Sequence, residues 1–508
     1  MDELLKRRTI TVARDVINCC EECGVSGEFT LPDYCPDIAV ILKCIMYPCV
    51  QNRQWSTDQL LVDGMSTVRV LYLDEDRCAV RSVEFSLPFS CMLRANGRTE
   101  MSPVELSLQT KYSTCRVLTP RRIEVRGAVT VSAIAQTSSE IPLVTSADIE
   151  GVYAKKCCTK VTYSIKTVEK IITLSESLEF PETLPPAEML LGGECRVVVR
   201  ECKLLTGKMI VKGQVYVHQL YTDDLDRHTT HCLDFVLPYS QIVDINGVVE
   251  GMPYWATAQI LSDTERCTVG PDGENTLLDV TIKLLLQVQV HVQDEVELLL
   301  DAYHTAYPLS KKMETIKIQS YCGCRWESST LPMQITLPMG QVAEIIDVWV
   351  TAQDCEAKCS SGMAAITGRM LVSIIGRDAE GQIWYSECPE EYHIEYAAEG
   401  NRIEADVVVT ELRYRVVGDS MELQVSVCVG VRVICESTHE IVSDVRLCED
   451  TPYAQQKASA LLYYAQANED VWDIACRCHT SPDCIREENQ LTADVLKQPA
   501  VLFVPLMS

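Results

Sequence analysis

Apolar and polar side chains alternate along most of the chain. The clearest segment runs from Ile282 to Gln293 and reads IKLLLQVQVHVQ, and comparable segments run from Arg122 to Ile134, from Leu278 to Val292 and from Met421 to Cys435. Strict alternation places one set of side chains toward a core and the other toward solvent, as in antiparallel sheets. The pattern predicts a mainly β protein.

The alternating segments belong to a larger internal repeat. VEFSLPFS, which begins at Val83, is matched 150 residues later by LDFVLPYS, which begins at Leu233. Other features recur in the same order: the proline pairs Pro32 with Pro36 and Pro181 with Pro185, the glycines Gly64 and Gly213, and, in a weaker third copy, Pro338 and Gly368. Because ordered recurrence indicates duplication, we predict three repeated antiparallel β-sandwich or barrel-like modules in tandem.

The pattern changes after about residue 450. Lys457 to Tyr464 and Val501 to Val504 have strand character, Val471 to Cys478 has helical periodicity, and a second short helix is expected over Ser481 to Asn489. Ser481 or Thr480 is the expected cap of that second helix. The tail is therefore predicted to be a small βααβ unit.

Length and composition agree with several folded domains. The chain has 508 residues, of which 47% are hydrophobic and 23% charged, whereas single domains usually hold about 100–150 residues. The expected boundaries are an N-terminal segment at 1–27, repeats at 28–140, 155–303 and 315–450, and the tail unit at 458–508.

Charge and hydropathy restrict the partners. The net charge of −27 repels phosphate, so nucleic acid is not an expected partner. No apolar run approaches the roughly 18 residues of a spanning helix, so no direct membrane insertion is expected. Met1 to Gly27 carries many charges and no apolar core of a secretory signal. We expect the protein to stay where it is made.

The 26 cysteines are expected to be reduced thiols in a chain that is not exported. Cys428 and Cys435 have strand positions that suit small buried hydrophobic side chains. Others lie in predicted linkers and are candidates for later crosslinking: Cys19, Cys20, Cys23, Cys157 and Cys158.

Motifs for catalysis or for a bound cofactor are missing from the sequence. It has no GxxxxGK loop, no GxGxxG between a strand and a helix, no GxSxG elbow and no HExxH helix. We therefore expect no enzymatic activity, no catalytic residue and no cofactor.

Four places have the residue types of a metal site. Cys476 to Cys484 holds three cysteines and His479, but it has no second CxxC pair at ligand spacing, so structural thiols are favoured. His228, His231 and Cys232 are interpreted as a solvated turn. Cys322 with Cys324 and Cys355 with Cys359 have no partner histidine. No metal site is predicted.

The tail resembles a LysM module. The matching positions are Tyr464, Val471-Trp472-Asp473-Ile474-Ala475, Ile485, Asn489 and Leu502-Phe503-Val504-Pro505. The repeats, with LPDYCPDIAVIL from Leu31 to Leu42 and their LPFS and LPYS strands, resemble the SPOCS domain of sporulation proteins. Three SPOCS repeats followed by one LysM module resemble the layout of the SipL-like family.

This resemblance implies a non-enzymatic adaptor of spore coat assembly. In that family the LysM module is thought to bind the stage IV coat-morphogenetic ATPase, and the protein acts in the mother-cell cytoplasm at the outer forespore surface, the site of the spore coat. Other coat proteins are the further partners that the resemblance implies.

The tail departs from the glycan-binding pattern of many LysM modules. Their Gly-Asp-Thr and Gly-Gln loops are replaced by Asn468-Glu469-Asp470 and Pro499-Ala500, and a lost glycine removes close backbone approach to a sugar. The candidate partner-binding residues are Asn468, Glu469, Asp470, Trp472, Arg486 and Glu487. Trp472 also fits a core position, together with Ile474, Ile485, Leu502 and Val504.

Two alternatives remain open. One is a protein of the cell wall or spore cortex that binds the N-acetylglucosamine glycan of peptidoglycan through the tail. The other is a self-assembling structural subunit that is crosslinked through its cysteines.

Overall fold

The computed structural model describes residues 5–76, 79–96, 103–147, 150–223, 229–271, 273–338, 342–360, 362–448, 451–453 and 458–506. Most of the described chain is β-strand, which confirms the mainly β prediction. The strands form small antiparallel sheets that do not close into barrels.

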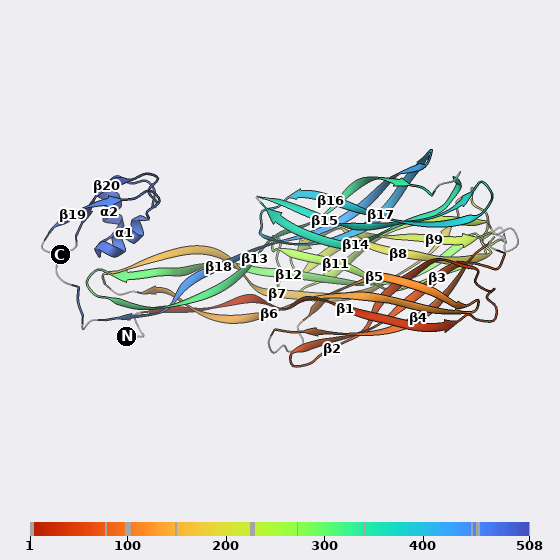
Figure 1. The fold of residues 1–508 in the computed structure, drawn as a ribbon. Helices are drawn as coiled ribbons and strands as arrows, with labels where there is room; N and C mark the ends of the chain where they lie inside the picture. The colour runs from red at the N-terminus through yellow and green to blue at the C-terminus, as the bar shows by residue number, and fades with distance from the viewer. Residues whose placement is uncertain are drawn as a thin grey trace.

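The same strand pairing recurs three times along the chain (Figure 1). In each set of six strands, the first, last and fifth form one sheet, with the last strand in the centre, and the second, third and fourth form another. Unit 1 contains β1 (Leu5–Thr30), β2 (Val40–Trp55), β3 (Gln59–Leu73), β4 (Val80–Arg94), β5 (Val104–Thr119) and β6 (Arg122–Ala147). Unit 2 contains β7 (Val152–Glu179), β8 (Met189–Leu205), β9 (Lys208–Thr222), β10 (Thr230–Asp244), β11 (Tyr254–Thr268) and β12 (Leu277–His304). Unit 3 contains β13 (Leu309–Thr336), β14 (Val342–Ser360), β15 (Met363–Asp378), β16 (Ile383–Ala397), β17 (Arg402–Val417) and β18 (Ser420–Leu447).

Most of the segment expected to precede the first repeat lies in β1. From Leu5 onward, β1 pairs along its whole length with β6. The pairing places the chain's first described residues in the β1-β6-β5 sheet of unit 1.

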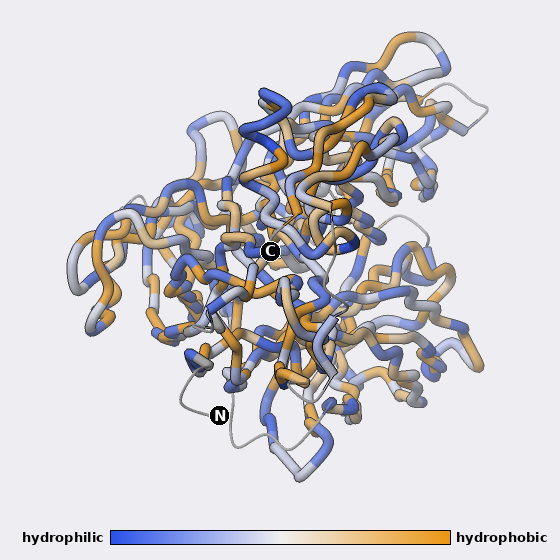
Figure 2. The backbone as a smooth tube through the Cα atoms, turned by 90° about the vertical axis from the view of Figure 1, so that its left-hand side faces the viewer, coloured by the Kyte–Doolittle hydropathy of each residue, from blue (hydrophilic) through white to orange (hydrophobic). Residues whose placement is uncertain are grey.

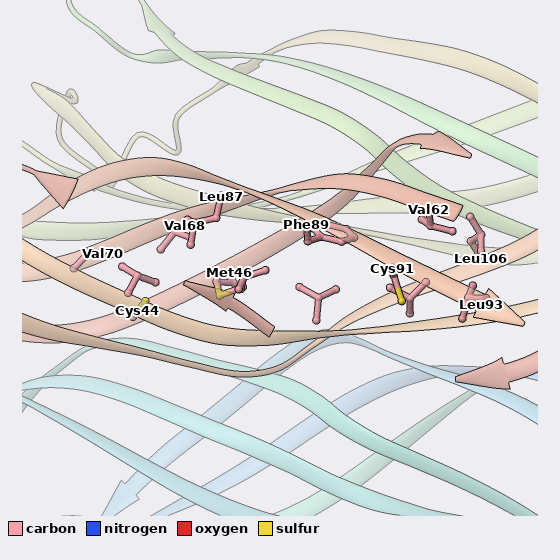
Figure 3. Close-up of a cluster of buried hydrophobic side chains, with 14 of the residues drawn as sticks. Cys44, Met46, Val62, Val68, Val70, Leu87, Phe89, Cys91, Leu93 and Leu106 are labelled. Carbon is pink, nitrogen blue, oxygen red and sulfur yellow. The ribbon is translucent and has the colours of Figure 1, made fainter. Parts of the chain in front are cut away.

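Each unit has its own apolar core between its two sheets. In unit 1, Met46, Val62, Phe89 and Leu106 come from four different strands and are buried in one cluster (Figure 3). Buried and less buried positions alternate along much of β3 and β4, and Figure 2 shows hydrophobic and hydrophilic residues interspersed along the chain, as expected for a sandwich with one face of each sheet inside.

The repeated glycines and aromatics face one another across strands. Gly64 pairs with Phe89 on β4, and Gly213 pairs with Tyr239 on β10. A Cβ atom at Gly213 would lie 2.4 Å from the Tyr239 ring, whose hydroxyl donates to the Val198 carbonyl at 3.1 Å. The glycine therefore makes room for the aromatic ring, which explains why the two residue types repeat together.

The pairs β1–β6, β7–β12 and β13–β18 extend beyond the sandwiches as three two-stranded ribbons (Figure 1). We call these ribbons the stalk: residues 5–15 with 136–147, 152–162 with 293–304, and 309–321 with 434–447. Each ribbon begins at a bulge that leaves one extra residue on the first strand: Val16, Tyr163 or Cys322. Bulges increase local twist, and the three ribbons pack on one another.

The stalk has a core to which all three ribbons contribute. Val12 of unit 1, Leu298 of unit 2 and Ile316 of unit 3 are buried in one apolar cluster. A disulfide joins Cys322 to Cys435 at the bulge of the third ribbon. The expectation of a free thiol at Cys435 was therefore wrong, whereas Cys428 is free and buried as predicted.

The alternation in β12 does not mark a solvent face, contrary to the prediction. Gln289 and His291 are 9% and 0% exposed. Neighbouring units cover them: Gln289 donates to Glu105 of unit 1 at 3.3 Å, and His291 stacks on Tyr321 of unit 3 with ring centroids 3.4 Å apart. Packing between units, which alternation cannot show, buries the polar face.

Arg432 of β18 joins all three units in this interior. Its side chain forms an ion pair with Glu105 of unit 1 at 3.1 Å and another with Glu404 of its own unit. It also donates to Gln289 at 3.2 Å and lies over the ring of Trp255, both in unit 2. Arg432 is 2% exposed, so these partners replace the hydration of its two terminal nitrogens, while its Nε is buried without a hydrogen-bond partner among the described residues.

The other sheet of each unit also meets its neighbours: β2-β3-β4, β8-β9-β10 and β14-β15-β16. They share a cluster of apolar side chains from every unit, including Leu71, Leu220 and Ile375. A polar contact accompanies each junction between neighbouring units. Lys43 of unit 1 contacts Ser373 at 2.6 Å and Glu387 at 2.5 Å in unit 3. Arg69 of unit 1 contacts the Gly193 carbonyl of unit 2, and His218 of unit 2 contacts Asp347 of unit 3 at 3.1 Å. Burial disfavours charge on His218, but Asp347 and Asp234 outweigh burial and raise the pKa of His218 to about 10.

The tail consists of β19 (Ala460–Ala465), α1 (Val471–Cys478), α2 (Pro482–Glu488) and β20 (Ala500–Pro505). β19 and β20 pair antiparallel. Ser481 caps α2 through its side-chain oxygen, one of the two predicted caps, and Asp470 caps α1 by accepting from the Trp472 amide at 2.9 Å. Lys457, the expected start of the first tail strand, lies outside the described residues.

Leu298→Ala tests whether the ribbons form one packed stalk. We expect a loss of about 2–5 kcal/mol in the free energy of unfolding, the usual cost of removing a buried leucine side chain. The exposed Glu295→Ala on the same strand should change it by less than about 0.5 kcal/mol. Urea unfolding measures both, and equal effects would contradict a shared core.

A second prediction concerns pH. Asp15 accepts hydrogen bonds from Arg402 at 2.8 Å and Gln136 at 2.6 Å. Burial alone would raise the pKa of Asp15, but these bonds and the Arg402 charge lower it below its usual value. The ionised carboxylate therefore stabilises the fold above its unfolded pKa of about 3.9, and this contribution is lost as pH falls through the folded pKa.

Asp15→Asn should consequently be less stable than the parent protein at pH 7, with the difference shrinking below about pH 4. The exposed Asp244→Asn is the matched control. Urea midpoints across the pH range measure the effect, and a difference that is constant with pH would show that Asp15 stabilises the fold without its charge.

Candidate functional site

The tail has a small core of its own that is completed by the stalk. The expected core positions are buried in it, together with Val471: Trp472, Ile474, Ile485, Leu502 and Val504. Tyr303, near the end of β12, belongs to the same cluster. The tail therefore packs on the ribbon of unit 2, at the end of the stalk farthest from the sandwiches (Figure 1).

Aromatic rings and hydrogen bonds fix this contact. The Trp472 ring lies edge-on to Tyr303 with centroids 5.0 Å apart, and its indole N–H donates to Asp301 at 2.9 Å. The Tyr303 hydroxyl donates to the Thr480 carbonyl at 2.5 Å. Burial raises the pKa of Tyr303, so the phenol remains protonated and able to donate.

Electrostatics reinforce the contact. Lys155 of β7 pairs with Asp470 at 2.5 Å. Burial raises the pKa of Asp470, but Lys155 and the Trp472 amide outweigh it, so the pKa lies below its usual value. The carboxylate that caps α1 is thus also the tail's ionic link to the stalk.

The six predicted partner-binding residues do not form one exposed surface. Asp470 and Trp472 face the protein's own stalk. Glu469 accepts from the Gln466 amide and the Tyr463 hydroxyl at 2.9 and 2.7 Å and also pairs with Arg477. Arg486 forms ion pairs with Asp483 and Asp494. Asn468 and Glu487 are exposed.

An apolar surface on the tail was missed by the sequence reasoning. The outward side of the β19–β20 sheet carries Leu462 opposite Phe503 and Tyr464 opposite Val501. Their exposed fractions are 61%, 44%, 73% and 56%. We call these four residues the outer tail face. Large apolar residues at consecutive positions of both strands were its sequence signal, because a two-stranded sheet covered by helices on one side leaves the other side in solvent.

Two of the places with metal-ligand residue types lie in or beside regular structure. Cys478 is buried, and the His479 ring stacks on Tyr453 with centroids 3.7 Å apart. Cys232 and His231 are in strand β10, not in a solvated turn as expected, and His231 lies 3.2 Å from Asp223. His228 lies outside the described residues.

Cys232 has close neighbours that could share a metal ion with it. Within the described ranges, two groups of three side chains have ligand atoms near enough for this: His218, Cys232 and Asp347, and Cys195, Asp263 and Glu265. Neither group was singled out in the sequence, because one member of each is distant from the others: Cys195 precedes Glu265 by 70 positions, and Asp347 follows Cys232 by more than 100.

Spanning helices are not found either. In the part of the chain that the structure describes, no helix combines the length and apolarity required to cross a bilayer.

Comparison with known proteins gives one family. The model described as SipL, SPOCS domain, matches residues 37–118 and 186–265. These stretches cover equivalent parts of units 1 and 2, from the second strand into the fifth. The match shows that these two stretches are similar to the SPOCS domain of SipL-like proteins. The SipL family is a sporulation family and not a known enzyme family. A search of curated proteins found no match.

Tyr303→Ala tests the docking of the tail. It removes a ring contact and a hydrogen bond to the tail, so we expect the tail to detach from the stalk. Small-angle X-ray scattering should show a larger radius of gyration. Tyr464→Ala, which truncates a ring on the exposed side of the same module, should leave it unchanged. Unchanged scattering for Tyr303→Ala would mean that other contacts suffice to hold the tail.

Proposed function

We propose that this protein is a non-enzymatic adaptor of spore coat assembly whose LysM-like tail binds the stage IV coat-morphogenetic ATPase. Three SPOCS-like repeats form the body that carries the tail and recruits other coat proteins. The adaptor acts in the mother-cell cytoplasm, at the outer surface of the forespore. The matched SPOCS stretches support the sporulation context, and the tail geometry supports the binding role.

The outer tail face is the observation that carries this proposal. Its four large apolar side chains are contiguous across two paired strands and remain exposed while the opposite side of the tail is packed on the stalk. Contiguous exposed apolar residues mark binding surfaces. A two-stranded sheet also has free edges to which a partner strand can add.

A protein partner suits the tail better than a glycan. The loop that would face a sugar contains Glu469, whose carboxylate is already bonded to the Gln466 amide, the Tyr463 hydroxyl and Arg477. Hydrogen-bonding groups used inside the loop are not free for sugar hydroxyls, whereas the outer tail face offers apolar area for a protein.

The docked arrangement adds rigidity to the adaptor. Because Trp472 and Asp470 bind the stalk, the outer tail face has a fixed direction relative to the three units. A fixed binding surface loses less entropy on association than one on a flexible tether. The proposed role of Asp470 and Trp472 is therefore to orient the tail, while the ATPase contacts the outer tail face.

Binding of the full-length protein to the purified ATPase tests the proposal. Phe503→Lys and Leu462→Lys should each weaken the affinity at least tenfold, equivalent to about 1.4 kcal/mol, because each puts a charge on the apolar contact. Met92→Lys, at a 60% exposed position on β4, is the matched control and should bind normally. Deletion of residues 455–508 should abolish binding.

Sedimentation with insoluble peptidoglycan is run in parallel on the same proteins. Binding to the ATPase that is lost in the two tail variants would support the adaptor. Binding to peptidoglycan alone would overturn it and move the protein to the wall- or cortex-binding class. ATPase binding that survives the deletion would assign recognition to the repeats.

A further inference from the structure

The three junctions between units have equivalent positions that hold different chemistry. Lys43, Gly192 and Asp347 each directly follow a bulge in the second strand of their unit, and they pair with Leu71, Leu220 and Ile375. Each position faces the third and fourth strands of the neighbouring unit. The facing pairs are Ser373 with Glu387, Arg69 with Glu84, and His218 with Asp234.

At two junctions a long cationic side chain spans the interface. Lys43 reaches Glu387 and Ser373, and Arg69 reaches Glu84 and the Gly193 carbonyl. At the junction of units 2 and 3 the equivalent positions hold two carboxylates, Asp347 and Asp234, with His218 between them. Arg196 is nearby but donates to the Val409 carbonyl at 3.2 Å.

Cys232 completes a ligand set at this junction. His218 Nε2, Cys232 Sγ and an Asp347 carboxylate oxygen all lie within 4.8 Å of one another. Imidazole, thiolate and carboxylate are the ligands that Zn²⁺ takes in proteins, at about 2.0–2.3 Å. Tetrahedral coordination at those lengths places ligand atoms roughly 3.3–3.6 Å apart, a spacing that small side-chain rotations would give.

The groups around His218 resemble those around a metal-binding histidine. Asp234 Oδ1 lies 2.8 Å from His218 Nδ1 and holds the ring with Nε2 directed at the Asp347 carboxylate, 3.1 Å away. A metal would replace that hydrogen bond; such carboxylate–histidine pairs support zinc ligands. The three ligands also border a cavity of about 310 Å³, which has room for water as a fourth ligand. Asp347 is 6% exposed and Cys232 is partly buried.

We propose that His218, Cys232 and Asp347 bind one Zn²⁺ ion that joins unit 2 to unit 3, in the place that a long cationic side chain occupies at the other two junctions. Binding releases the thiol proton of Cys232 and any proton on His218 Nε2. The second group, Cys195, Asp263 and Glu265, has no histidine, and the Arg69 side chain lines the cavity beside it.

Metal content and spectroscopy of the full-length protein test this proposal. The protein is purified under a non-thiol reductant, stripped with a chelator and titrated with Zn²⁺, and Co²⁺ is used as the spectroscopic probe. We expect one tight equivalent of zinc, and for Co²⁺ the visible bands of tetrahedral coordination with a thiolate charge-transfer band. Cys232→Ser and His218→Gln should lose that equivalent and those bands.

Cys195→Ser is the matched control, because it removes a thiol from the other group and should retain both signals. Asp234→Asn keeps all three ligands and should weaken zinc affinity by about 10–100-fold, as expected for a group that supports a ligand. Circular dichroism confirms that each variant folds.

Thermal melts give a second readout that does not depend on metal counting. Zinc should raise the melting temperature of the stripped parent protein. His218→Arg, which imitates the Arg69 junction, should melt at a temperature that the chelator does not change. The proposal is wrong if the stripped protein takes up no tight zinc, or if uptake is the same in Cys232→Ser and His218→Gln as in the parent.

Discussion

The fold depends on how three β-sandwiches share one polar interior, and Arg432 is the residue at which this sharing is most concentrated. Its guanidinium contacts Glu105 of unit 1, Gln289 and Trp255 of unit 2 and Glu404 of its own unit. A buried cation that loses a partner costs about 3–5 kcal/mol. Any shift of a unit that takes its partner residue away from Arg432 would therefore lower the stability of the fold.

The same constraint positions the stalk and the tail. Because the β1-β6-β5, β7-β12-β11 and β13-β18-β17 sheets meet around their central strands, their ribbons leave the sandwiches side by side and bury a common core containing Leu298. The ribbon of unit 2 ends at Asp301 and Tyr303, which hold Trp472 and Thr480 of the tail. Contacts between units thus determine, over a long distance, the direction of the outer tail face.

Variation at equivalent positions distinguishes the junctions. Lys43, Gly192 and Asp347 occupy the same ladder position, yet they present an ammonium group, an open backbone and a carboxylate to the neighbouring unit. The repeated fold keeps these positions opposite a neighbour, while the side chains give each pair of units its own contact. Three similar units in one chain can in this way take a defined order, because each face matches one neighbour.

Local physics let the sequence alone determine the strands, the repeat and the tail helices. Alternation, the paired glycines and aromatics, and the helical spacing of Val471 to Cys478 are short-range patterns, and the structure has elements at these places. Only the tertiary structure decided which polar faces are buried and which tail residues are exposed. Gln289 and His291 look solvent-facing in sequence but are covered by other units. Asp470 and Trp472 meet residues of β7 and β12, and Cys232 meets Asp347 more than 100 positions away. Such contacts depend on how distant segments pack, which no local pattern of residues encodes.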